Sequence, residues 1–424
     1  MQTNERRPIP FAKPYAGKEE EEAVLRVLRS GWFTTGRETI EFEKEFSDFF
    51  KSNGGTAEAE PLYCMAVNSA TSGLHLALEA FGIAPGDLVF LPSMTFTATA
   101  EVVRYLGAEA VFVDVLKDGF HMDPSALENT LDRLDRGNAP YPSRSRGGEG
   151  FGPRGKAKAV IPVHYGGLPC GMEAILSIAK KYGLKVIEDA AHSFPSFAPD
   201  KNSGGRWAGL MGDAGVFSFY ATKTITTGEG GMVVTRDQAR AGRIKVMRSH
   251  GIDRSVWNRY TDTNASWYYE VVAPGYKYNI PDLLSALGRV QLGRAMELLS
   301  MRIKIADLYD QAFGDDPHFT IPPTGPGDAR HLYPLRLNLP ALSIDRDQFA
   351  LKMQEQGIGI SVHFIPLHIM PYYRERYSMK EDDLAETIKT YRRAVSLPIW
   401  PGMSDAEVNR VIEVVKTLGS EYTV

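Results

Sequence analysis

The chain has 424 residues, of which 43% are hydrophobic and 24% charged, and its formal net charge is −4. This composition is typical of a folded globular protein and excludes the disordered, collagen-like and coiled-coil classes. The lack of a basic excess argues against a nucleic-acid partner. The two cysteines, Cys64 and Cys170, suit a reducing compartment, and no apolar run reaches the length of about 18 residues that crosses a membrane. We therefore expect a cytoplasmic enzyme.

Hydrophobic periodicity predicts alternating helices and strands over the first 290 residues. The predicted helices lie at 19–30, 38–50, 74–81, 97–106, 124–134 and 172–182. The predicted strands lie at 62–67, 87–91, 110–115, 159–163, 184–187, 214–219 and 232–235. Most of these strands are apolar throughout, as in sheets buried on both faces. The alternation predicts an α/β fold with a mostly parallel sheet.

One segment, residues 136–156, interrupts this pattern. It is rich in Gly, Pro, Arg and Ser, which predicts a long surface loop or a locally disordered insertion. Gly150, Gly155 and Lys156 have the spacing of a phosphate-binding loop. However, Ala157 replaces the hydroxyl residue that would bind Mg²⁺, and no apolar strand precedes the segment. Both departures disfavour the alternative that the protein is an ATPase.

The C-terminal part has a different texture. One long helix is predicted at 291–313, strands at 332–339 and 358–364, and a final helix at 404–418. This mixture predicts a smaller α+β domain. We therefore expect two domains, a large one at 1–290 that includes the 136–156 insertion and a small one at 291–424.

Acidic and basic residues follow two of the predicted strands. Asp189 and His192 come directly after one strand, and Lys223 follows another about 30 residues later. Ligands of open α/β sheets bind at the carboxyl ends of strands. A lysine that can form a Schiff base and a carboxylate that can pair with a protonated pyridine nitrogen are what pyridoxal 5′-phosphate needs. The amine suits this use because its pKa falls when it is desolvated.

A phosphate group would need donors as well. Ala70, Thr71 and Ser72 begin a predicted helix, where backbone N–H groups, hydroxyls and the helix dipole favour an anion. Ser218 could add a further hydroxyl. Each of these residues also has an ordinary interpretation, as a helix cap, a core residue or a solvated side chain. Their order along the chain is what favours a site.

That order has a wider context, because many short motifs occur together. They are NSATSGLHLAL (68–78), PGD (85–87), LPSMTFTATA (91–100), FVDV (112–115), VHYGG (163–167), IEDAAH (187–192), GDAGVFSFYATK (212–223), TGEGG (227–231), RSHG (248–251), GYKYN (275–279), HFIPLH (363–368) and SLPIWP (396–401). With these motifs the chain resembles the DegT/DnrJ/StrS family of nucleotide-sugar aminotransferases over almost its whole length, apart from the insertion.

The resemblance implies the fold of the PLP-dependent transferases of fold type I, a large domain with a seven-stranded sheet and a smaller α+β domain. Lys223 looks like the Schiff-base lysine and Asp189 like the partner of the pyridine nitrogen. His192 and Phe96 match side chains that lie against the cofactor ring. Asn279 resembles the asparagine that reaches the phosphate of the neighbouring subunit, so the resemblance implies a homodimer with shared active sites. The positions that match further phosphate contacts are Ala70, Thr71, Ser72 and Ser218.

The resemblance also implies the substrates. L-glutamate would donate the amine, and a 4-keto sugar linked to UDP or GDP would accept it. The segments that the family places near the sugar or nucleotide supply Thr34, Thr35, Tyr333, His363 and His368 as candidate substrate contacts. For the two histidines, capping of backbone groups is an equal alternative. No metal site is expected, since no set of His, Cys and carboxylate residues has ligand spacing.

Three other functions stay open at this point. The enzyme could aminate a 3-keto sugar instead. It could be a sugar dehydratase of the same fold, although those relatives carry His where Lys223 stands. It could also be a non-catalytic regulatory protein, although Asp189, Lys223 and the phosphate-site residues are all present.

Overall fold

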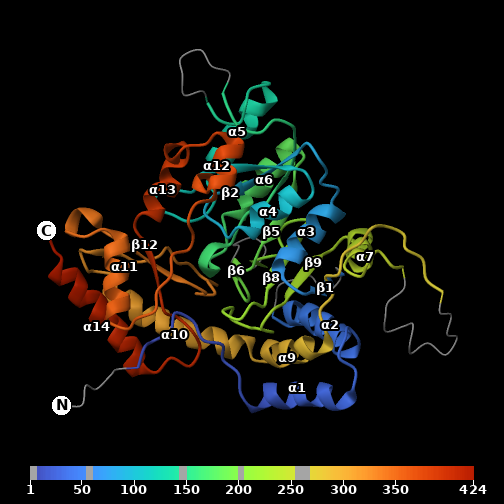
Figure 1. The fold of residues 1–424 in the computed structure, drawn as a ribbon, viewed down its shortest axis with the longest axis horizontal. Helices are drawn as coiled ribbons and strands as arrows, with labels where there is room; N and C mark the ends of the chain where they lie inside the picture. Colours follow the sequence, from blue (N-terminus) through green and yellow to red (C-terminus); the bar gives the residue numbers. More distant parts are fainter. Residues whose placement is uncertain (1–6, 54–60, 143–149, 199–204, 254–267) are drawn as a thin grey trace.

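The structure is a computed structural model that describes residues 7–53, 61–142, 150–198, 205–253 and 268–424. A seven-stranded sheet with the order β1-β9-β8-β5-β4-β2-β3 lies at its centre (Figure 1). Strand β9 is antiparallel to both of its neighbours, and all other pairs are parallel. The strands are β1 Tyr63–Val67, β2 Asp87–Pro92, β3 Glu109–Val113, β4 Lys156–Val160, β5 Lys185–Asp189, β8 Ala214–Ser218 and β9 Gly231–Thr235. The predicted α/β fold is confirmed.

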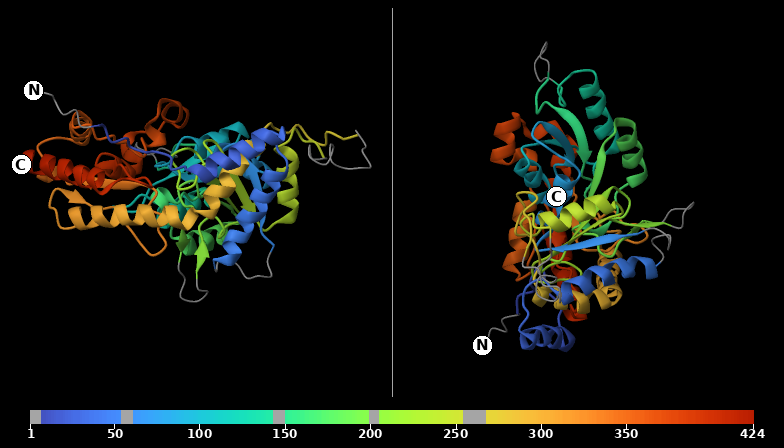
Figure 2. Two further views of the ribbon diagram at one scale, coloured as in Figure 1. Left: turned by 90° about the horizontal axis from the view of Figure 1, so that it is seen from below. Right: turned by 90° about the vertical axis from the view of Figure 1, so that its right-hand side faces the viewer.

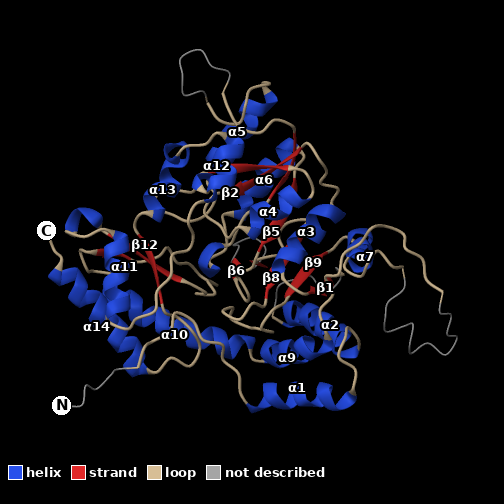
Figure 3. Cartoon of the chain, viewed as in Figure 1, coloured by secondary structure: helices blue, strands red, loops and turns tan. Residues whose placement is uncertain are grey.

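Helices cover both faces of this sheet (Figure 3). They are α1 Lys18–Ser30, α2 Arg37–Ser52, α3 Ala70–Ala80, α4 Ala98–Tyr105, α5 Pro124–Asp135, α6 Met172–Tyr182, α7 Gln238–Met247 and α9 Asp282–Gly293. Along β1, Met65 and Val67 pack in the core that includes α3 to α6, whereas Cys64 and Ala66 pack in a second core with the phenylalanines of α2. The strands therefore read as continuous apolar runs because alternate residues enter two different cores.

The C-terminal part forms a three-stranded antiparallel sheet with the order β10-β11-β12. Its strands are β10 Phe319–Thr320, β11 Tyr333–Leu337 and β12 Ala394–Leu397, and its helices are α10 Ala295–Phe313, α11 Arg346–Glu355, α12 Pro371–Tyr377, α13 Ala385–Tyr391 and α14 Asp405–Glu421. A short two-stranded sheet, β6 Phe197–Ala198 with β7 Arg206–Trp207, lies beside the larger sheet. No helix in the described ranges has the length and apolar character that a bilayer span requires.

Contacts cross the predicted domain boundary near residue 290 at several places, of which two are examples. Ile9, from the N-terminal segment, packs in the core of the three-stranded sheet, and Tyr373 of α12 packs edge-on against Phe112 of β3, with ring centroids 5.2 Å apart. The division at residue 290 stays a prediction.

Helix α10 links the two parts of the molecule. Its first turns, with Ala295 and Leu298, pack in the core that contains the phenylalanines of α2, which we call the aromatic core. Its later turns, with Ile305 and Tyr309, pack in the core of the three-stranded sheet. In the left view of Figure 2 this helix, in orange, runs from one part to the other. The middle of α10 is therefore the point where the two cores meet.

Two predicted elements are wrong. The single helix at 291–313 is two helices, because the chain leaves helical geometry at Arg294, between α9 and α10. The strand at 358–364 is an irregular segment that makes isolated bridges from Ile358 to Ile9 and from Ser361 to Ser396. A side chain at Gly359 would approach the backbone nitrogen of Phe11 to 2.6 Å, so this segment is shaped by the N-terminal segment that lies against it.

The insertion is anchored at its described ends. Tyr141 and Phe151 form a backbone bridge, and the buried Tyr141 hydroxyl donates to the carbonyl of Phe112 at 2.9 Å. Residues 143–149 of the insertion lie outside the described residues. Because Lys156 opens strand β4, the Gly150 to Lys156 segment precedes a strand, whereas a phosphate-binding loop of ATPases follows one and opens a helix. The ATPase alternative therefore has no structural support.

Candidate active site

A cavity of about 550 Å³ lies where strands β5 and β8 end and helix α3 begins. Parallel strands bring their carboxyl ends to one edge of the sheet, and the N-terminus of α3 returns to that edge after β1. The predicted site residues among those that line this cavity are Ala70, Thr71, Phe96, Asp189, His192, Ser218, Lys223 and His363.

Lys223 lies in the turn that follows β8. Its backbone N–H donates to the carbonyl of Tyr220 at 2.9 Å, and its Nζ atom lies 3.5 Å from Nε2 of His331. Burial and the positive charge of Arg302 lower the pKa of the Lys223 amine to about 7, although the negative charge of Asp189 acts in the opposite direction. The amine can therefore exchange a proton near neutral pH.

Asp189 ends strand β5, and its side chain is only 6% exposed. Oδ2 accepts the hydroxyl of Thr99 at 2.8 Å, and Oδ1 accepts the backbone N–H of Ala191 at 3.1 Å. Burial raises the pKa of the Asp189 carboxyl, while the Thr99 hydroxyl, the Ala191 N–H and the charge of Lys223 oppose that rise. Thr99 in turn lies 2.8 Å from the hydroxyl of Thr95. Because Thr99 has one hydrogen and gives it to Asp189, Thr95 must donate to Thr99.

Three histidines surround the lysine. The rings of His192 and His331 lie 4.7 Å apart, and that of His363 lies 4.9 Å from Phe364, which itself lies 5.8 Å from His192. Burial, together with the positive charge of Lys223, lowers the pKa of His192 and of His331 well below the usual range and that of His363 to about 3. All three rings are therefore neutral at pH 7, and they add no charge that would repel a cationic amine.

The start of helix α3 forms an anion-binding end of the cavity. Ser69 caps the helix and accepts the N–H of Ser72 at 3.1 Å, and the first amides of a helix have no acceptor inside it. Gly73 lets the helix come close to the sheet, since a Cβ there would lie 2.7 Å from Cγ1 of Val216. Ala70 and Thr71 line the cavity from this end, as does the buried Ser218. A phosphate would meet backbone N–H groups and a positive dipole end here.

Phe96 lies at the open side of the cavity. Its ring is 58% exposed and lies 5.9 Å from that of Phe364. A large exposed aromatic that lines a cavity offers a flat surface against which a planar ring can stack.

Three of the predicted site residues, Ser72, Thr35 and Asn279, do not line the cavity. The Ser72 hydroxyl donates to the side chain of Asn68 at 2.7 Å and so stabilises the turn before α3. The Asn279 amide donates to Thr35 at 2.6 Å, and the Thr35 hydroxyl donates to the carbonyl of Ile280 at 2.5 Å. The amide oxygen of Asn279 is buried and has no hydrogen-bond partner among the described residues.

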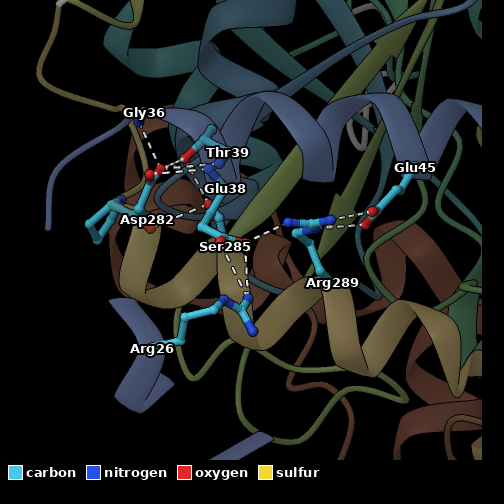
Figure 4. A network of polar contacts seen from close by, with 9 residues as sticks. Arg26, Gly36, Glu38, Thr39, Glu45, Asp282, Ser285 and Arg289 are labelled. Carbon is cyan, nitrogen blue, oxygen red and sulfur yellow. Dashed lines mark hydrogen bonds and ion pairs between the residues drawn. The ribbon is translucent and has the colours of Figure 1, made fainter. Parts of the chain in front are cut away.

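The turn that contains Thr34 and Thr35 is held by one carboxylate (Figure 4). Asp282 of α9 accepts the N–H groups of Gly36 at 2.7 Å, Glu38 at 3.1 Å and Thr39 at 3.1 Å. A carboxylate at this position neutralises the N-terminus of α2. Arg289, also on α9, pairs with Glu38 and Glu45 in the same network. Helices α2 and α9 therefore fix the turn at a place outside the cavity.

The structure does not bring Tyr333 and His368 to the cavity. Tyr333 is fully buried in the core of the three-stranded sheet, where its hydroxyl donates to Asp310 at 2.8 Å. His368 is also fully buried and lies 2.7 Å from the hydroxyl of Ser93 and 3.1 Å from the carbonyl of Glu381. His368 therefore acts as a structural residue that forms hydrogen bonds with buried polar groups. Neither residue enters the function proposed below.

The family of the protein follows from comparison with known proteins. A family model described as the DegT/DnrJ/EryC1/StrS aminotransferase family matches residues 14–416. The chain belongs to this family. It is thus an enzyme of the PLP-dependent sugar aminotransferases, and the predicted fold type I is confirmed by solved structures of the same architecture.

Several members of the DegT/DnrJ/EryC1/StrS family are similar over nearly their whole length. The spore coat polysaccharide biosynthesis protein SpsC of Bacillus subtilis is 40% identical over 414 residues, which cover 97% of each chain. The candidate sugar aminotransferase Spr1654 of Streptococcus pneumoniae, in its PMP form, has a TM-score of 0.82 at 28% identity and covers 97% of this chain and 99% of its own. PseC of Helicobacter pylori, an aminotransferase involved in the biosynthesis of pseudoaminic acid, has a TM-score of 0.82 at 26% identity over 98% of this chain and 100% of its own.

The cofactor of this family is pyridoxal 5′-phosphate, and the Streptococcus protein is also solved in its PLP form, with a TM-score of 0.81 at 28% identity over 98% of this chain and 99% of that chain. The residues present here fit that cofactor. The cavity combines an amine of lowered pKa, a buried carboxylate and a helix N-terminus suited to an anion.

Sequence reasoning missed three residues of the site. Thr99 falls inside a quoted motif, but the motif alone does not indicate that its hydroxyl bonds Asp189. His331 and Arg302 lie more than 70 residues beyond Lys223 in the chain, in a part that carries no strand-end signal. For Arg302 the sequence gives a partial signal. An arginine on the apolar face of a predicted helix must be buried, and a buried guanidinium needs hydrogen-bond acceptors around it.

Proposed function

We propose that this enzyme transfers the amino group of L-glutamate to a keto sugar linked to a nucleoside diphosphate, with a 4-keto sugar on UDP or GDP as the favoured acceptor. The observation that carries the proposal is the amine of Lys223, with a pKa of about 7, in one cavity with the buried carboxylate of Asp189. The names of SpsC, a spore coat polysaccharide biosynthesis protein, and of PseC, an aminotransferase of pseudoaminic acid biosynthesis, support a sugar acceptor. The motifs GYKYN (275–279) and HFIPLH (363–368) resemble those of family members that aminate C4, which is why we favour a 4-keto sugar.

Each residue has a defined task in this proposal. When bound, pyridoxal 5′-phosphate supplies an aldehyde that combines with amines and a protonated ring that withdraws electrons from the reacting carbon. Lys223 holds the cofactor and, once displaced, accepts the proton from the α-carbon of glutamate. Asp189 would keep the pyridine nitrogen protonated, and His192 and Phe96, which line the cavity, would contact the cofactor ring. The N-terminus of α3, with Ala70 and Thr71, would hold the phosphate together with Ser218, whereas Ser72 would act indirectly, by stabilising the turn before α3.

Of the five substrate contacts predicted from the sequence, only His363 lines the cavity of this subunit. We assign it to the sugar side. Thr34 and Thr35 lie outside this subunit's cavity, in the turn next to Asn279. We propose that this turn and Asn279 serve the cavity of a second subunit. The buried, unpartnered amide oxygen of Asn279 and the exposed apolar side chains of Phe33, Ile40 and Val271 support a homodimer with shared active sites.

Shared sites are tested by mixing two inactive variants, Lys223→Ala and Asn279→Ala. In a mixed dimer one cavity carries both defects and the other carries neither. Recovery of activity after subunit exchange is the expected result. Two variants that stay inactive when mixed, although mass spectrometry shows mixed dimers, would refute the sharing. Analytical ultracentrifugation of the wild type gives the oligomeric state independently.

The acceptor is tested with a panel of 4-keto and 3-keto sugars on UDP, GDP and dTDP, with glutamate as donor and the products analysed by mass spectrometry and NMR. Amination at C4 on UDP or GDP is expected. A product aminated only at C3 would make the enzyme a 3-keto sugar aminotransferase, and loss of a hydroxyl without gain of nitrogen would make it a dehydratase. Failure to bind pyridoxal 5′-phosphate at all would favour the alternative that the protein has a non-catalytic, regulatory function.

A further inference from the structure

Arg302 is a buried cation at the junction of the two cores. It lies on α10 and is 1% exposed. Within the described part of the chain, its guanidinium forms no ion pair with a carboxylate, and burial lowers its pKa to about 10. Burying an unpaired charge destabilises the folded protein unless hydrogen bonds compensate for the lost hydration.

The guanidinium binds three backbone carbonyls instead. Nη1 donates to His331 at 3.1 Å and to Ile399 at 2.8 Å, and Nη2 donates to Thr222 at 3.1 Å. The three acceptors come from three different segments of the chain. The planar fork of an arginine holds several acceptors in fixed directions, which a lysine ammonium does not.

All three segments belong to the active site. Thr222 immediately precedes Lys223, and it lines the cavity itself. His331 places its ring 3.5 Å from the Lys223 amine. Ile399 also lines the cavity. One side chain therefore joins the loop that carries Lys223 to two segments that flank the strands of the C-terminal sheet.

We propose that Arg302 is a positioning residue that fixes Lys223 and His331 relative to each other and places a positive charge close to the Lys223 amine. This inference rests on the role proposed for Lys223 but does not depend on which sugar is used. Arg302 does not reach the cavity, since it is fully buried and is not among the residues that line it.

Besides burial, the positive charge of Arg302 lowers the pKa of the Lys223 amine. A positive charge nearby disfavours protonation of an amine, and burial acts in the same direction. The groups that face Lys223 from the surrounding elements are Asp189 at the end of β5, His192 after it, His331 before β11 and His363 near the N-terminal segment. The three histidines are neutral at pH 7, so Asp189 and Arg302 are the charges that oppose each other.

The experiment measures the proton affinity of Lys223 in the cofactor-free protein. Trace labelling with acetic anhydride across a pH series, followed by peptide mass spectrometry, gives the midpoint for Lys223. The wild-type midpoint is expected near pH 7, and Arg302→Met is expected to raise it by about one pH unit or more. Arg302→Lys keeps the charge but loses the fork, so we expect a midpoint near that of the wild type and a kcat lower by about tenfold or more.

Arg346 offers a matched control. It is also a buried arginine, 6% exposed, whose guanidinium donates to the carbonyls of Tyr391 at 3.1 Å and Ala394 at 3.3 Å and to the carboxylate of Asp347 at 2.5 Å. It lies on α11, and none of these three partners lines the cavity. Arg346→Met should lower the thermal midpoint of unfolding without changing the Lys223 midpoint. An unchanged Lys223 midpoint in Arg302→Met would overturn the charge effect. If that variant does not fold, wild-type kcat in Arg302→Lys would overturn the positioning effect.

Discussion

The hydrogen bond from Thr99 to Asp189 gives a prediction that the sequence motifs do not contain. Thr99 is fully buried and its hydroxyl lies 2.8 Å from Oδ2 of Asp189. Substitution Thr99→Val removes this donor and keeps the shape of the side chain. The carboxylate then keeps only the Ala191 N–H among its hydrogen bonds to the described residues.

The size of the effect follows from the charge on the acceptor. A hydrogen bond to a charged group contributes about 1.5–3 kcal/mol. Since one pKa unit corresponds to about 1.4 kcal/mol, loss of the bond should raise the pKa of Asp189 by about 1–2 units. Asp189 must be ionised to hold the proton on the pyridine nitrogen, so the acid limb of the rate profile should move to higher pH by the same amount, and kcat at pH 7 should fall.

The assay is kcat against pH with saturating glutamate and keto sugar. Thr99→Ser restores the hydroxyl and should return the acid limb toward its wild-type position. Thr95→Val is the control for lost polarity near the site, because Thr95 bonds Thr99 and not Asp189, and its effect should be smaller. A Thr99→Val enzyme with the wild-type acid limb and wild-type kcat would refute the reasoning.

Two further predictions concern Asp189 and the aromatic core. Asp189→Asn should lower kcat by about 10- to 100-fold while leaving the cofactor attached, and it should move the Lys223 labelling midpoint below that of the wild type, because the Asp189 charge raises the pKa of Lys223; an upward shift would contradict this. Phe46 is fully buried and its ring lies 4.9 Å from Phe194 and 5.3 Å from Phe217. Phe46→Ala should lower the free energy of unfolding by about 3–5 kcal/mol in urea denaturation, whereas Leu351→Ala, at a side chain 54% exposed, should change it by less than about 0.5 kcal/mol.

The large sheet could be predicted from sequence because its signal is local. Each strand is an apolar run bounded by turn residues. Asp189 is the last residue of β5, and Lys223 lies in the turn that follows β8. The segment 358–364 has the same apolar character, yet its shape depends on the N-terminal segment hundreds of residues away, which no local pattern contains. The break at Arg294 was hidden for a similar reason, since apolar periodicity continues on both sides of it.

The candidate site divides in the same way. Residues at strand ends and helix starts could be found because their position follows from the fold, as for Lys223, Asp189 and Thr71. Tyr333 was misplaced because a side chain on a buried strand can face the core, and here its hydroxyl reaches Asp310. His331 contacts Lys223, and Arg302 contacts the neighbouring Thr222, across a long stretch of sequence, so the residues around them in the chain carry no sign of the lysine.

The proposed function requires Lys223 to hold the cofactor. Borohydride reduction of the holoenzyme, followed by digestion and mass spectrometry, fixes the cofactor to the residue that binds it. We expect a phosphopyridoxyl group on the peptide that contains Lys223, whereas Lys223→Ala should carry no such group and show no turnover. A phosphopyridoxyl group on another lysine, or wild-type turnover in Lys223→Ala, would contradict it.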